Sequence, residues 1–188
     1  DTNTNTDVLG RRVCCSRFFG GKEFEMVAGD APAEAASLDK VAELIARGTV
    51  ALPSFTDSGG PVPGKGGKGR ILGPAPESPA ERSSLAGLYC AQMVNEQLDA
   101  VASNGDIVVD GPFAQNAVLM ALLAQLRPEQ KVLASDLRDG TTVGAATLAL
   151  IDDGQLPAIG LSLKQVAPAT IDRLHDYHAD WKVRAYAL

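Results

Sequence analysis

The chain has 188 residues, of which 45% are hydrophobic and 21% are charged, so it is long and apolar enough to fold as one domain with a sizeable core. This balance excludes a disordered tail, a collagen-like chain and a small disulfide-stabilised scaffold. A formal net charge of −6 without a long basic stretch argues against nucleic acid as a partner. The longest apolar run, residues 117–124, is about half of what a membrane-spanning helix needs, so no membrane partner is expected either.

The beginning of the chain and its cysteines indicate a cytoplasmic protein. The chain opens with the polar run DTNTNTD rather than a signal peptide, and it lacks an initiator Met, either through trimming or because residue 1 is not the natural start. Cys14, Cys15 and Cys90 are odd in number, and the adjacent pair would point to opposite faces of a strand. We expect all three to be reduced, small, partly buried residues.

The first quarter of the chain alternates between strand and helix patterns. Ser37 is a plausible N-cap and Gly48 a plausible end for the second helix. The expected elements are a strand over 11–19, a short helix over 22–28, a helix over 38–47 and a short buried strand over 49–52.

Residues 53–80 form one long irregular stretch with six prolines and many glycines. A loop of this length inside a domain is uncommon and is usually functional or mobile.

Beyond this loop, short apolar strands alternate regularly with helices. We expect helices over 83–101, 114–125, 142–151 and 169–186, and strands over 106–109 and 131–134. Such alternation predicts an α/β domain built around a largely parallel edge, and the meander-like N-terminal strands favour a mixed sheet.

The long loop contains most of a P-loop pattern, in Gly59, Gly64, Lys65 and Gly66. Gly66 occupies the position of the Ser or Thr that binds Mg²⁺, and the sequence that follows cannot easily begin a helix. The expectation is therefore a flexible basic surface loop, not a nucleoside triphosphate site.

A second glycine-rich turn, Gly20–Gly21, stands between the first strand and the first helix. Two glycines let a ligand approach the backbone, and a helix N-terminus offers free N–H groups to an anion. Sequence physics leaves two readings open, an ordinary turn and a phosphate-adjacent turn.

The strongest local feature is a buried strand that ends at Asp110–Gly111 and is followed by a helix from about Ala114. Ligands of open α/β sheets bind outside the carboxyl ends of strands, beside the following helix N-termini. Pro112 suits a first turn, and Asn116 could either read the edge of a planar base or cap the helix. An ordinary strand–turn–helix corner is the alternative.

Two further features are expected to be structural. Gly144, Ala145 and Ala146 would allow a helix to pack very closely against a neighbouring element. His175 and His178 lie three residues apart on a polar helix and are expected to form a surface pair.

Taken in order, these motifs resemble the C-terminal half of the FGGY family of carbohydrate kinases, which belong to the sugar kinase, Hsp70 and actin superfamily. The glycine turn in FFGGKEFE, the Gly/Pro loop within residues 51–73 and the helix SLAGLYCAQMVNEQLDAV are similar to successive landmarks of the family. The segment IVVDGPFAQNAVLMALLAQL followed by TTVGAATLAL resembles the family's adenosine motif and closing helix. GPF, in place of the usual Gly-Gly, is closer to the L-fuculose and rhamnulose kinase branch.

The resemblance implies a fold and a nucleotide site. The fold would be an actin-like ATPase (RNase H-like) α/β domain, with a mixed sheet flanked by helices and without its first strand, over residues 1–188. The implied nucleotide contacts are Gly111, Pro112, Phe113 and Asn116 on the adenosine side and Gly20 and Gly21 on the phosphate side. Pro112 replaces a family glycine and so removes one N–H.

The resemblance also implies a reaction that these residues cannot complete. Family kinases transfer the γ-phosphate of Mg·ATP to a sugar hydroxyl with an aspartate as base, and that aspartate, the sugar contacts and most Mg²⁺ contacts lie upstream of the matched region. We expect no catalytic or metal-ligating residue in this chain, no turnover by it alone, and a sugar bound through an N-terminal domain. A homo-oligomer, association with the N-terminal part as a separate chain, and a non-catalytic interaction module that retains the fold are left open.

Overall fold

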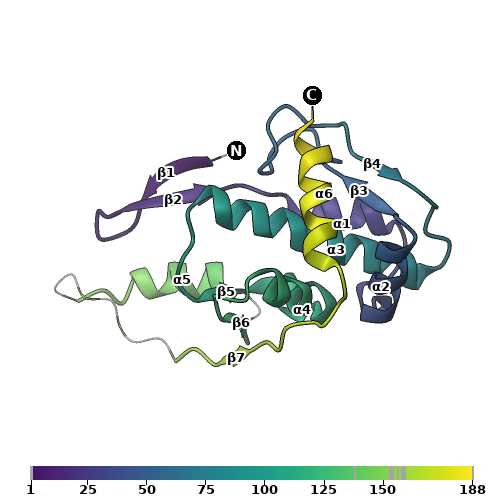
Figure 1. Ribbon diagram of the computed structural model, residues 1–188. Helices are drawn as coiled ribbons and strands as arrows, with labels where there is room; N and C mark the ends of the chain where they lie inside the picture. Colours follow the sequence, from purple (N-terminus) through teal and green to yellow (C-terminus); the bar gives the residue numbers. More distant parts are fainter. Residues whose placement is uncertain (1, 138, 153–154, 156, 158–159, 188) are drawn as a thin grey trace.

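A computed structural model describes residues 2–137, 139–152, 155, 157 and 160–187. A long helix, α3 (Pro79–Ala100), runs through the middle of the molecule and packs against α1, α2 and α4 (Figure 1). Leu85, Leu88, Tyr89 and Met93 on this helix have no exposed surface. The core is therefore built around one helix surrounded by shorter ones.

The other helices are shorter than α3 and are separated by strands or loops. They are α1 (Gly20–Ala28), α2 (Leu38–Ala46), α4 (Ala117–Leu126), α5 (Gly140–Leu148) and α6 (Leu174–Tyr186), with short 3₁₀ helices η1 (Ala33–Ala35) and η2 (Gly111–Gln115).

The described strands form three small sheets. β1 (Thr2–Thr6) pairs antiparallel with β2 (Arg12–Ser16), and β3 (Val50–Leu52) pairs antiparallel with β4 (Arg70–Leu72). β5 (Ile107–Val109) and β6 (Val132–Ser135) are parallel, and β7 (Leu163–Gln165) is antiparallel to β6. The mixed α/β architecture agrees with the sequence, and its parallel pair is joined by η2 and α4.

The starts of α2 and α3 follow from local capping chemistry. Ser37 accepts a hydrogen bond from Lys40 N at 3.3 Å, as the sequence predicts. Ser78 and Glu81 form a capping box, which moves the start of α3 to Pro79. Hydrogen bonds from the backbone N–H groups of Glu77 and Ser78 lower the pKa of Glu81 to about 2.

Several predicted boundaries are wrong. The strand predicted over 11–19 ends at Ser16, and the loop predicted over 53–80 contains β4. β1 and β7 were not predicted, because TNTNT and LKQ are polar and wholly exposed and lack the apolar pattern of a buried strand.

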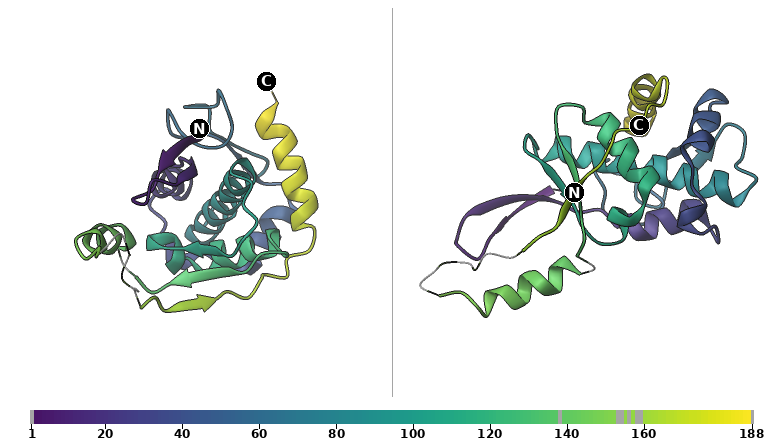
Figure 2. Two further views of the ribbon diagram at one scale, coloured as in Figure 1. Left: turned by 90° about the vertical axis from the view of Figure 1, so that its left-hand side faces the viewer. Right: turned by 90° about the horizontal axis from the view of Figure 1, so that it is seen from below.

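The β1–β2 hairpin and α5 project from the same side of the helical body (Figures 1 and 2). The expectation that Gly144, Ala145 and Ala146 form a close-packing face is wrong, since all three are exposed. Helix α5 buries only Thr147 against the described chain.

All three cysteines are free, and they differ in exposure. Cys90 is buried on α3 and Cys15 is half-buried, but Cys14 is exposed, so the expected partial burial is wrong for Cys14. The two adjacent cysteines lie on a hairpin strand whose first three residues are exposed and whose last two are half-buried. Burial, and the nearby charge of Glu23, raise the pKa of the Cys90 thiol.

Candidate nucleotide site

Gly20 and Gly21 form the first turn of α1 rather than a turn before it, because α1 begins two residues earlier than predicted. The first helical hydrogen bond runs from Glu23 N to Phe19 O at 2.9 Å. The N–H groups of Gly20 and Gly21 therefore precede the helical hydrogen-bond pattern and lie at the positive end of the helix dipole.

Gly20 lies against the ring of Phe113. A Cβ at Gly20 would be 2.6 Å from Phe113 Cζ and 2.7 Å from Cε2, so a side chain at this position would require the ring to move. This contact joins the predicted phosphate-side turn to the predicted adenosine-side turn, although the two are far apart in the sequence.

The chain leaves β5 through a left-handed residue, Gly111, whose φ is 72°. Residues Gly111–Gln115 then form η2, with Pro112 in its first turn, and α4 begins only at Ala117. The predicted helix start at Ala114 is therefore wrong. The strand, the short 3₁₀ turn and the helix nevertheless occur in the predicted order.

Asn116 caps α4. Its Oδ1 accepts a hydrogen bond from Leu119 N at 2.9 Å, which fixes the orientation of the amide. The other end of the amide, Nδ2, makes no hydrogen bond within the described part of the chain. Capping and reading a base are thus compatible, since capping uses the oxygen and leaves the donor.

A cavity of about 680 Å³ lies between α1, η1, η2 and the start of α4. This volume is in the range of small-ligand sites. Four of the six predicted contact residues line it, namely Gly21, Pro112, Phe113 and Asn116. Gly20 adjoins it through Phe113, whereas Gly111 shapes the turn and is not among the lining residues.

The remaining lining residues were not predicted. Phe24 and Glu25 follow Gly21 at helical spacing of three and four, so the period of α1 could have indicated them. Ala33, Glu34 and Ala36 lie in and next to η1, which has no strong motif in the sequence. Gln115, Ala117 and Val118 lie at the end of η2 and the start of α4, beside the predicted Asn116. The cavity thus combines apolar walls with the carboxylates of Glu25 and Glu34.

The C-terminal end of β5 is also tied to α5. Asp110 Oδ2 accepts a hydrogen bond from Gly140 N at 2.9 Å, and a Cβ at Gly140 would lie 2.2 Å from that oxygen. Asp139 caps α5, and its side-chain hydrogen bond from Thr142 lowers the pKa of Asp139. The corner after β5 therefore positions two later helices, α4 and α5.

The P-loop-like segment is not a P-loop. Lys65 is followed by β4 and not by a helix. The segment is also not the loose surface loop that the sequence suggests: a Cβ at Gly66 would lie 2.0 Å from Asp57 O, and at Gly69 it would lie 2.4 Å from the ring of Phe55. These glycines allow the loop to fold compactly on itself.

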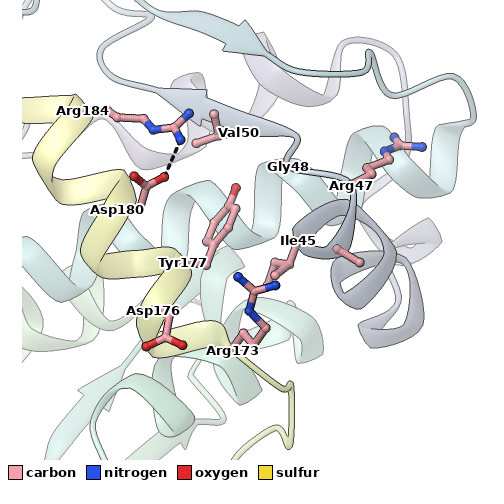
Figure 3. A pocket seen from close by; sticks show the side chains of 10 residues that line it. Ile45, Arg47, Gly48, Val50, Arg173, Asp176, Tyr177, Asp180 and Arg184 are labelled. Atoms are coloured by element: carbon pink, nitrogen blue, oxygen red, sulfur yellow. Dashed lines mark ion pairs between the residues drawn. The ribbon is translucent and has the colours of Figure 1, made fainter.

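A second cavity, of about 360 Å³, lies between the C-terminal end of α2 and α6 (Figure 3). Arg173 and Arg184 line it, and Arg184 is paired with Asp180 at 2.7 Å. Tyr177 lies between them and donates a hydrogen bond to Thr49 O at 2.7 Å. None of the predicted site residues lines this cavity.

The expected surface pair of histidines is wrong for His178. His175 is exposed, but the side chain of His178 is 12% exposed and lies 3.2 Å from Glu96 Oε1 and 5.6 Å, centroid to centroid, from the ring of Trp181. Helix α6 directs the side chain of His178 toward α3. His175 therefore lies in solvent, and His178 lies in the interface of α3 and α6.

Two features are absent from the described residues: a cluster of metal ligands and a membrane-spanning helix. No group of three or more His, Cys, Asp or Glu side chains in this part of the chain could hold a metal ion, so we assign no residue to Mg²⁺. No helix of the described segments is long and apolar enough to cross a membrane.

Comparison with solved structures identifies the fold as the actin-like α/β fold of carbohydrate kinases. The chain is similar to the crystal structure of a carbohydrate kinase from Novosphingobium aromaticivorans, with 31% identity and a TM-score of 0.74 over 98% of this chain and 39% of that one. It also resembles xylulose kinase from Rhodospirillum rubrum, with 16% identity and a TM-score of 0.57 over 92% and 38%. For Plasmodium falciparum glycerol kinase with ADP, the identity is 17% and the TM-score 0.60 over 94% and 39%.

Residues 1–157 match the family model for the carbohydrate kinase FGGY C-terminal domain. The chain therefore belongs to the FGGY carbohydrate kinase family. A search of curated proteins found no match. The chain spans about 39% of the length of the first of these solved kinases.

Proposed function

We propose that this chain is the nucleotide-binding C-terminal lobe of an ATP-dependent carbohydrate kinase. The observation that carries the proposal is the cavity of about 680 Å³, because residues from both predicted halves of the site, Gly21 and Phe113 among them, line it. Membership of the family supports the kinase class, and the glycerol kinase of similar fold was solved with ADP.

In this proposal the adenosine lies against η2 and the start of α4. Phe113 provides an apolar surface for the base, and Asn116 Nδ2 donates to an acceptor on the edge of the base while Oδ1 remains in the cap. The phosphates extend toward the N–H groups at the first turn of α1. Glu25 and Glu34 are the acceptors available to ribose hydroxyls or the exocyclic amine.

The reaction itself needs groups that this proposal assigns to the rest of the kinase. Phosphoryl transfer to a sugar hydroxyl requires a base near the hydroxyl and a cation at the phosphates, and it proceeds by positioning and charge stabilisation. We assign the nucleotide to this lobe and the sugar, the base and Mg²⁺ to the N-terminal domain. The 188-residue chain alone is expected to bind nucleotide without phosphorylating a sugar.

A thermal-shift titration with ATP and with ADP tests the proposal. A ligand that binds only the folded chain raises the melting temperature in proportion to ln(1 + [L]/Kd), so both nucleotides should raise it. In Asn116→Ser the hydroxyl can still cap α4, but the amide donor is lost. The variant should therefore fold, and its Kd for ATP and ADP should be about tenfold higher than that of the wild type.

Lys65→Ala is the matched control for the P-loop-like segment. It should respond to nucleotide as the wild type does. A wild-type chain whose melting temperature is unchanged by either nucleotide would favour a non-catalytic interaction module and contradict the proposal.

A further inference from the structure

A buried carboxylate, Glu23, connects three parts of the structure. Glu23 is 1% exposed and accepts hydrogen bonds from Phe55 N at 2.9 Å, Thr56 N at 3.0 Å, Thr56 Oγ1 at 2.6 Å and Tyr89 Oη at 2.8 Å. A buried charge is tolerated when its acceptor positions are filled in this way. The side chain therefore ties α1 to the Gly/Pro loop and to α3.

The same loop holds the residues immediately before α1. Gly60 N donates to Arg17 O at 2.8 Å. The ring of Phe19 lies so close to Gly59 that a Cβ there would be 3.1 Å from Phe19 Cδ2. The loop thus contacts the chain on both sides of the first turn of α1, at residues 17–19 and at Glu23.

The loop is rigid enough to hold α1 in place, because hydrogen bonds within the loop close it. Ser54 N donates to Lys65 O at 3.1 Å, Gly69 N to Ser54 O at 2.7 Å, and Gly67 N to Thr56 O at 2.8 Å. Residues 54–69, called the brace below, therefore form a compact unit.

We propose that Glu23 is a positioning residue whose carboxylate fixes the brace to α1 and thereby sets the place of the Gly20–Gly21 turn in the nucleotide site. The assignment rests on the proposed function. Glu23 touches no part of the cavity itself, but Gly21 and Phe24 on the same helix line it. The proposed surface for the base, Phe113 and Asn116, lies on η2 and at the start of α4, outside both α1 and the brace.

This arrangement predicts that the loss of Glu23 changes the affinities for two ligands, ADP and adenosine, to different extents. Displacing the first turn of α1 should weaken binding of the phosphates more than binding of the base, because Phe113 and Asn116 stand on η2 and at the start of α4. Adenosine and ADP differ only in the phosphates, so the ratio of their dissociation constants measures the placement of the turn, whereas a general loss of stability would not change that ratio.

The experiment measures Kd for ADP and for adenosine by isothermal titration in the wild-type chain and in Glu23→Gln. The glutamine keeps the volume, but its amide nitrogen faces donors that need an acceptor. We expect the Kd for ADP to rise about tenfold or more and the Kd for adenosine to change less than about twofold. Trypsin should cleave after Lys65 and Lys68 faster in the variant, because the brace is released.

Glu43→Gln is the matched control. Glu43 is an exposed glutamate on α2 that pairs with Lys40 at 2.6 Å, so its substitution removes one negative charge without touching α1 or the brace. Both dissociation constants and the cleavage rate should remain at wild-type values.

Thr56→Val provides a milder test should Glu23→Gln unfold. It removes one of the four donors and keeps both backbone N–H groups, so the ADP Kd should rise about threefold with adenosine unchanged. Folded variants with wild-type cleavage and an unchanged ratio of the two dissociation constants would overturn the assignment of Glu23 alone. A wild-type chain that binds neither ligand would overturn the proposed function and this assignment together.

Discussion

The contact between Gly20 and Phe113 decides how the two sides of the cavity meet. A methyl group at residue 20 would overlap the end of the Phe113 ring, which belongs to a side chain that can move aside. Displacement of that ring costs little packing, since Phe113 is only half-buried, but it alters the wall of the nucleotide site. The glycine at position 20 is therefore explained by the Phe113 ring lying close to its backbone, and not by a backbone conformation that only glycine adopts.

Gly20→Ala should lower nucleotide affinity much more than stability. We expect the free energy of unfolding to change by less than about 1 kcal/mol, while the Kd for ADP rises about tenfold. Urea denaturation and isothermal titration measure the two quantities. Gly144→Ala is the control, because a Cβ there meets nothing within 4 Å, and both values should stay near wild type. A Gly20→Ala chain with unchanged ADP affinity would contradict this role for the contact.

Some residue roles were predictable from sequence and others were not. The glycines, Phe113 and Asn116 stand beside turns, and turn chemistry together with the family resemblance identified them. Glu23 and His178 were not identified, because a charged residue on a helix is usually exposed and only the packed structure reveals which face it lies on. Their partners come from elements more than 30 residues away.

At the scale of elements, α6 is held to the rest of the molecule by polar side chains as well as by packing. Trp181 is fully buried and donates a hydrogen bond to Ala51 O at 2.7 Å. On α3, Glu96 is 2% exposed and pairs with His178 at 3.2 Å and with Lys182 at 2.9 Å. Tyr186 Oη also donates to Glu96 at 3.1 Å, which completes a buried acceptor with three partners.

Because of this network, the stability gained from the packing of α6 on α3 depends on pH. Burial alone would raise the pKa of Glu96, but the hydrogen bonds from His178 and Lys182 lower it below its ordinary value of 4.5. A carboxylate whose pKa is lower in the folded state contributes stability above its unfolded pKa. That contribution is lost as the pH falls through the folded pKa, below 4.5.

Glu96→Gln should therefore reduce stability at neutral pH and matter less in acid. We expect a loss of about 1–3 kcal/mol at about pH 7, which shrinks as the pH falls below 4.5 and the wild-type carboxylate becomes protonated. Urea unfolding of both chains across this range tests it. Asp180→Asn removes an exposed pair on the same helix and should cost less than about 1 kcal/mol at any pH. A deficit for Glu96→Gln that is independent of pH would show that Glu96 contributes only through packing.

The elements that could be predicted from sequence are those whose own residues carry an apolar pattern or a helix cap. Apolar strands and helices with caps were found to within a few residues, as α2 shows. The polar strands β1 and β7 were missed because their pairing partners, not their composition, define them. The start of α4 was misplaced because Gly111 and Pro112 first form a 3₁₀ turn and Asn116 then caps the helix.

For the molecule as a whole, the order of motifs was more informative than any single motif. The family follows from the succession of the glycine turn, the long loop, the central helix and the adenosine segment, and the comparisons confirm it. The cavity could not be predicted from sequence, because α1, η1 and α4 are brought to its edges by their packing on α3, which only the folded structure shows.

The outer surface agrees with a lobe that has a partner domain. Large apolar side chains lie exposed on β5, at and beyond the end of α5, and on and near β7: Val108, Leu148, Leu150, Leu161 and Leu163. Exposed apolar surface of this kind favours association. We propose that the N-terminal domain of the kinase covers this side.

Titration of the ¹⁵N-labelled chain with ADP, followed by two-dimensional NMR, shows directly where the nucleotide binds. We expect the backbone amide signals of Gly20, Gly21, Phe24, Phe113 and Asn116 to shift together and to saturate with one dissociation constant. Signals around the smaller cavity at Arg173 should remain where they are. Saturable shifts confined to that second cavity, or a spectrum that ADP leaves unchanged, would contradict a nucleotide site between α1 and α4.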